Sequence, residues 1–156
     1  MDHSFHDMKI ATIENKVFRI NLRMILFFLL TSYSITTWSQ NIVTDTLVWN
    51  STSAVNQQDT STLNYTCSFA TTALTNVDWI QAGGKHVSHF SVNSTDGQWT
   101  DVSKDGQLTY DVSNGAVTGV ITFSRSGGVL SVHLKLFVNG KLDQDYVFNI
   151  SDIRPN

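Results

Sequence analysis

The chain has 156 residues with 10 basic and 13 acidic side chains, one Cys and one Pro. This length fits one ordinary domain, and the 41% of hydrophobic residues are enough to form a core. The composition excludes a disordered chain, a collagen, a coiled coil and a multi-span membrane protein. The net charge of −3 gives no electrostatic reason to expect nucleic-acid binding.

Residues 1–39 have the composition of a secretory signal peptide. Four basic side chains come first, and they are Lys9, Lys16, Arg19 and Arg23. An uncharged apolar run then begins at Met24, and small residues at positions 37 and 39 fit a cut before Gln40. Because residues 24–38 fall short of the about 20 that a spanning helix needs, we expect no membrane span after cleavage.

The leader therefore predicts a secreted or periplasmic protein that is cleaved near Ser39 and Gln40. The initiator is Met1, Met8 or Met24, three alternatives that the sequence leaves open. Residues 40–156 would then form a single mature domain. All the acidic residues of this part are Asp, and the absence of Glu removes a good helix former.

Beyond residue 39 the hydrophobic pattern is that of β-strands. Apolar and polar residues alternate clearly over 61–69, 108–112, 116–125, 128–139 and 141–151. Weaker runs cover 42–49, 77–80, 87–92 and 98–102. Two irregularities interrupt the pattern, because Gly119 indicates a bulge or kink and Gln144 falls among the apolar positions Leu142, Tyr146, Phe148 and Ile150.

Short turn sequences separate the strand-like runs. They are Asp105-Gly106, Asn114-Gly115, Gly127-Gly128 and Asn139-Gly140. Parallel strands would need long crossovers, and no spacers of that length are present. The fold class is therefore all-β, a single antiparallel meander of eight or nine strands. Such a sheet must close into an up-and-down barrel or fold over into a two-sheet β-sandwich, and both solutions stay open.

Groups that could carry chemistry do not form recognised constellations. His86 and His89 are three residues apart, which puts them on opposite faces of a strand, whereas two ligands on one strand need a spacing of two. Cys67 lies on an inward face without a basic neighbour, as expected of a buried, unreactive thiol. His133 lies on a polar face, where we expect it to be exposed.

The carboxylates are also placed for solubility rather than for catalysis. Asp143 and Asp145 lie on a polar face, and most other Asp residues lie at turns. No calcium-binding loop and no Gly-x-Ser-x-Gly motif is present in the sequence. We therefore predict a protein that is not an enzyme, with no catalytic residues, no metal and no cofactor.

The aromatic side chains are the candidates for ligand binding. We assign this role to Tyr65, Trp79, Trp99, Tyr110 and Tyr146, which would line a cavity if the barrel holds one. Gly97-Gln98-Trp99 resembles the Gly-x-Trp signature of the lipocalins, but in that family the motif lies on the first strand. Here it lies in mid-chain, so we assign the chain to no family.

Three functional hypotheses follow from this reading. The first is a barrel of lipocalin-like architecture that binds a small apolar ligand. The second is a β-sandwich module that recognises glycans or a protein partner at the cell surface, and the third is a cryptic hydrolase. A closed barrel with a hollow interior favours the first hypothesis, whereas two packed sheets with a solid core favour the second.

Overall fold

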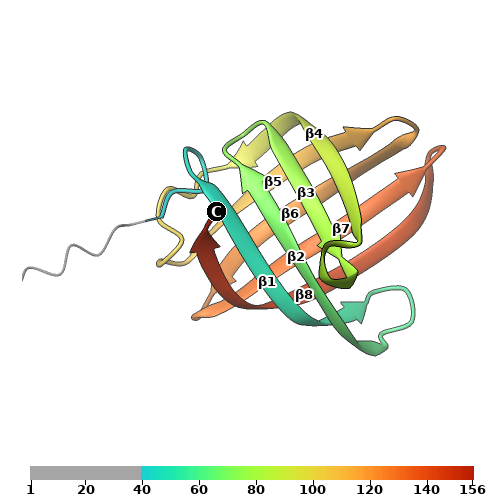
Figure 1. Cartoon of the computed structure of the whole chain (residues 1–156), viewed down its shortest axis with the longest axis horizontal. Coiled ribbons are helices and arrows are strands. Elements are labelled where there is room, and N and C mark those ends of the chain that lie inside the picture. Colours follow the sequence, from blue (N-terminus) through green and yellow to red (C-terminus); the bar gives the residue numbers. More distant parts are fainter. Residues whose placement is uncertain (1–39) are drawn as a thin grey trace, which may run out of the picture. The chain divides into compact units, whose positions relative to one another are not determined.

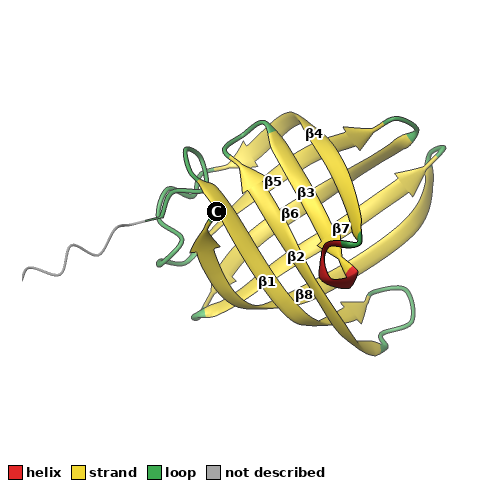
Figure 2. Ribbon diagram, viewed as in Figure 1, coloured by secondary structure: helices red, strands yellow, loops and turns green. Residues whose placement is uncertain are grey.

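The computed structural model describes residues 40–156, and these residues form a closed antiparallel barrel (Figure 1). The elements are β1 (Thr46–Asn56), β2 (Thr62–Thr72), β3 (Asn76–Gln81), the 3-10 turn η1 (Ala82–Gly84), β4 (His86–Gly97), β5 (Gly106–Asn114), β6 (Val117–Ser126), β7 (Val129–Val138) and β8 (Lys141–Pro155). Figure 2 shows that strands dominate this part of the chain. No helix in it is long and apolar enough to cross a membrane.

Each strand pairs with the next one in the sequence, and β8 returns to pair with β1. The predicted all-β meander is therefore confirmed, and the structure selects the up-and-down barrel over the sandwich. The signal peptide predicted for residues 1–39 lies outside the described residues. The β7–β8 turn has the geometry that its sequence requires, because Asn139 and Gly140 both have positive φ, 51° and 75°.

The connections gather at the two ends of the barrel (Figure 1). One end, called here the terminal end, carries the β2–β3, β4–β5 and β6–β7 connections and residues 40–45. The other, called the pocket end, carries the β1–β2, β3–β4, β5–β6 and β7–β8 connections. Inward-facing side chains fill most of the space between them, and the largest of those that are fully buried are Trp49, Tyr110, Phe69, Phe123 and Phe148.

The terminal end is closed by the β4–β5 connection. The prediction of a strand over 98–102 was wrong, because β4 ends at Gly97 and the chain then folds across the barrel. The Trp99 ring lies 5.7 Å from that of Trp49, and its Nε1 donates a hydrogen bond to the Lys104 carbonyl at 3.0 Å. Gly106 makes room for this ring, since a Cβ there would lie 2.2 Å from Cδ1 of Trp99.

The predicted phase of β8 was wrong at its beginning. A register shift between Leu136 and Phe137 pairs Gln144 with Leu136 but Leu142 with Phe137. A bulge of this kind adds one residue and reverses the faces beyond it. Leu142 is therefore exposed instead of sharing the inward face of Tyr146, and Gln144 is the first inward residue of the strand.

Gly119 also has a different role from the predicted one. The pairing of β6 with both neighbours continues through it without a shift, so it marks no bulge. A Cβ at this position would lie 2.5 Å from Cδ2 of Leu136 and 2.6 Å from the Lys135 carbonyl oxygen. The glycine thus leaves the space that the Leu136 side chain occupies inside the barrel.

A candidate ligand pocket at one end of the barrel

The pocket end holds a cavity of about 90 Å³. Its lining comes from the inward faces of four strands and consists of Ala54, Tyr65, Trp79, Gln144, Tyr146 and Phe148. These strands are β1, β2, β3 and β8, which are neighbours because β8 pairs with β1. Closure of the barrel therefore brings the two ends of the domain sequence together around one space.

Aromatic rings form the walls of this pocket and hold one another in place. The centroid of Phe148 lies 5.9 Å from those of Tyr65 and Trp79 and 6.0 Å from that of Tyr146. Behind them, Phe69 stacks parallel to Trp79 with an interplanar angle of 2°. Such contacts restrict the ring rotamers, so the pocket presents preformed apolar surfaces.

Two polar atoms in the lining have no hydrogen-bond partner. They are Oε1 of Gln144 and Nε1 of Trp79, and both are buried. A buried polar atom without a partner costs about 1–3 kcal/mol of stability, so such atoms are uncommon in native proteins. Of the two tyrosine hydroxyls in the lining, that of Tyr65 is already engaged as a donor, because it donates to Oε1 of Gln81 at 2.6 Å, and Tyr146 carries the other.

The ionisable groups around the pocket are held in their neutral forms. Burial raises the pKa of the Cys67 thiol to about 11, an effect that the nearby Trp79 side chain partly offsets. The Trp79 indole and this sulfur are close, but their contact lacks hydrogen-bond geometry, and a thiol is a weak acceptor. Burial also raises the pKa of Tyr65, and nearby Cys67 and Tyr146 raise it further. No residue that lines the pocket carries a formal charge at neutral pH.

The five predicted ligand-binding residues divide between the two ends of the barrel. Tyr65, Trp79 and Tyr146 line the pocket. Trp99 lies instead in the packed terminal end, and Tyr110 is fully buried with its hydroxyl donating to the Ala73 carbonyl at 3.1 Å. Burial raises the pKa of Tyr110 far above its ordinary value.

The sequence reasoning missed three residues of the lining, namely Ala54, Gln144 and Phe148. Of these, Gln144 carried a signal, since it interrupted an apolar alternation. A polar side chain in an inward position of a barrel strand points to a cavity, because a filled core has no place for it.

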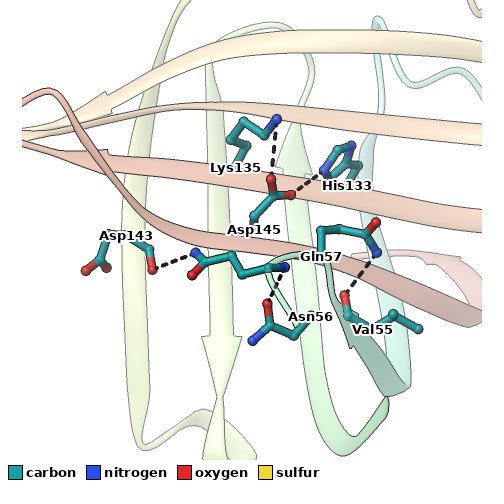
Figure 3. Close-up of polar contacts among 8 residues, drawn as sticks. Val55, Asn56, Gln57, His133, Lys135, Asp143 and Asp145 are labelled. Carbon is teal, nitrogen blue, oxygen red and sulfur yellow. Dashed lines mark hydrogen bonds and ion pairs between the residues drawn. The ribbon is translucent and has the colours of Figure 1, made fainter. Parts of the chain in front are cut away.

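A second polar cluster lies on the outside of the barrel. Nε2 of His133 lies 2.7 Å from Oδ1 of Asp145, and Nζ of Lys135 lies 3.3 Å from Oδ2. Asp145 is only 8% exposed, although the alternation had placed it on a solvent-facing side. Figure 3 shows the contacts of Asp145 with His133 and Lys135, beside the β1–β2 connection. This connection contributes to the burial, since the backbone N–H of Gln57 donates to the Asp145 carbonyl oxygen at 2.8 Å.

The remaining candidate groups are dispersed over the described residues. His86 pairs with Gln81 and His89 with Asp78 in the β3–β4 register, so the two histidines face opposite sides as their spacing predicted. His89 contacts Asp78 at 2.9 Å on the exposed face. Within residues 40–156, no three His, Cys, Asp or Glu side chains gather closely enough to hold a metal ion.

A scan against protein-family models, a search of curated proteins and a search of solved structures find no match to this chain.

Proposed function

We propose that the chain is a secreted or periplasmic binding protein that holds a small, mainly apolar ligand in the pocket of its barrel and catalyses no reaction. The observation that carries the proposal is the aromatic lining, in which Tyr65, Trp79, Tyr146 and Phe148 surround one uncharged cavity. Pockets of this kind, with mostly apolar walls and a few polar atoms, are typical of small-molecule sites. The leader composition supports the compartment.

The contrast between the two ends of the barrel also supports binding at one of them. At the terminal end, Trp99 and the β4–β5 connection close the interior. At the pocket end the lining includes Tyr65 and Tyr146, which are only partly buried, and the rim residue Leu63 is 36% exposed. A ligand can therefore reach the cavity without opening the packed part of the core.

Binding of a small aromatic hydrocarbon tests this function. Toluene should cause saturable amide chemical-shift changes in the protein, concentrated at residues around Tyr65, Trp79 and Tyr146. Ala54→Leu, which adds side-chain volume at a pocket position that is 1% exposed, should abolish these changes. Thr52→Leu, at an exposed position of the same strand, should leave them intact. A folded protein in which toluene shifts no pocket resonance would rule the function out.

A further inference from the structure

The Gln144 amide lies in a position of the barrel that an apolar core residue would ordinarily fill. It is the first inward residue of β8 and shares its face with Tyr146 and Phe148. Its Oε1 is buried without a partner, inside a lining that is otherwise mostly apolar. An apolar residue there would avoid the unsatisfied atom, so the amide is better explained by a group that enters the pocket.

Trp79 supplies the second free polar atom, from a different wall. It belongs to β3, whereas Gln144 belongs to β8, and β1 and β2 lie between these strands. The Trp79 N–H is a pure donor, and its buried Nε1 makes no hydrogen bond. Among the buried polar atoms of the lining, one acceptor and one donor are therefore left for a ligand, and the lining carries no charge.

We propose that the pocket recognises a small neutral ligand that carries one hydroxyl on a hydrocarbon ring, with the hydroxyl at Gln144 and within reach of the Trp79 N–H. This inference rests on the proposed function and names the class of ligand. The ring packs against the aromatic walls, and the hydroxyl hydrogen goes to Oε1 of Gln144. If the Gln144 amide is turned over, its NH2 faces the ligand instead of Oε1. The same hydroxyl then accepts a hydrogen bond from the NH2, because a hydroxyl both donates and accepts.

Other ligand classes fit these atoms less well. A hydrocarbon leaves both polar atoms without partners, and with the Gln144 amide oriented as in the structure a carbonyl group has no hydrogen for its Oε1. A charged ligand would lose its hydration in a pocket without a counter-charge. A sugar brings more hydroxyls than the few polar groups of this mostly aromatic lining can pair, since the Tyr65 hydroxyl already donates to Gln81.

Phenol and toluene form the probe pair for this inference, because they have nearly the same shape and differ in the hydroxyl. Their dissociation constants for the protein should be measured by amide chemical-shift titration. We expect phenol to bind about 2–10-fold more tightly, as one additional hydrogen bond provides. Gln144→Met, which keeps the side-chain length, should abolish this preference without weakening toluene binding, and Trp79→Phe should reduce the preference.

Gln107→Met is the matched control, since Gln107 is an exposed glutamine on β5, and the phenol preference should persist in it. If Gln144→Met does not fold, Gln144→Leu provides the same comparison. Equal binding of phenol and toluene, or a preference that survives both Gln144 substitutions, overturns the ligand class and leaves the proposed function standing. Failure of both probes to bind overturns both. Tighter binding of glucose than of phenol overturns the class in favour of a glycan.

Discussion

His133 and Asp145 are joined on the outer face of the barrel, where Nε2 and Oδ1 lie 2.7 Å apart. The Asp145 side chain is 12% exposed, and Lys135 contacts its second oxygen at 3.3 Å. Charged groups shielded from water in this way need their partners, because the unpaired charge loses hydration without compensation. His133, Lys135 and Asp145, called here the outer cluster, therefore have a structural role in the pairing of β7 with β8.

Asp145→Ala should lower the free energy of unfolding by about 1.5–3 kcal/mol, the range for hydrogen bonds to a charged group. Asp143→Ala is the matched control two residues away, because Asp143 is exposed, and its cost should stay within about 0.5 kcal/mol. Urea unfolding measures both values. Equal costs would show that the outer cluster does not stabilise the fold.

Leu134 and His133 are neighbours in β7 that face opposite sides. Leu134 is 0% exposed, so Leu134→Ala should cost about 2–5 kcal/mol in the same experiment. His133→Ala should cost about 1 kcal/mol, because it removes a hydrogen bond from Asp145. A His133→Ala cost as large as that of Leu134→Ala would contradict the placement of these residues on the two faces.

Gly119→Ala should destabilise the barrel by about 1–3 kcal/mol, as overpacking does, because the new methyl group would meet the Leu136 side chain and the Lys135 carbonyl. Thr118→Ala, at the adjacent exposed position, should change stability little. Thermal unfolding of the two variants provides the comparison. A neutral Gly119→Ala would mean that β6 and β7 are less closely packed than the structure has them.

Cys67 should react slowly with iodoacetamide in the native protein. With its pKa raised from 9.0 to about 11, the thiolate fraction at pH 8 is about 100-fold lower than in the unfolded chain. Alkylation followed by mass spectrometry should show clearly slower modification of the native protein than of the denatured protein. Cys67→Ser is the control, since the chain has one cysteine. Comparable native and denatured rates would contradict the burial of the thiol.

The raised pKa of the Cys67 thiol also makes the free energy of unfolding depend on pH. Below pH 9 the thiol is mostly protonated in both the folded and the unfolded chain, so the stability that the buried neutral thiol contributes is fully present. Between pH 9 and about pH 11 the unfolded chain binds fewer protons than the folded one. Stability should therefore fall over this window, and Cys67→Ser should remove that part of the fall.

The mature protein should begin at or near Gln40. The basic segment, the short apolar run and the small residues before this position motivate the expectation. N-terminal sequencing of protein from the medium or the periplasm measures the start. Isolation of a membrane-bound chain that retains residues 24–39 would refute the cleavage.

Alternation and turn chemistry were sufficient to predict the meander, because both are local properties of the sequence. They were also sufficient to place Leu134 and Cys67 inside the barrel. The bulge at Asp143 was not predictable, since nothing around Leu142 distinguishes an added residue from a regular strand. Its consequence is that the inward face of β8 begins with Gln144.

The candidate site was predictable only in part, because it depends on where inward residues lie along the barrel axis. Trp79 and Trp99 both face the interior, but one lies in the pocket and the other in the packed end. Strand stagger places Trp79, and the folding of the β4–β5 connection places Trp99; both depend on the closed barrel as a whole. The burial of Asp145 depends likewise on a connection from β1, almost 90 residues earlier in the chain.

The pairing of β1 with β8 has a consequence for the order of folding. Seven of the strand pairs join neighbours in sequence, but the eighth joins residues about 100 positions apart, such as Asn50 and Asp152. Closing so long a loop is entropically slow, and it requires the last strand. A chain emerging from the ribosome therefore exposes an unpaired β1 edge throughout its synthesis. Pairing with β8 is therefore the step that removes the last open edge of the sheet.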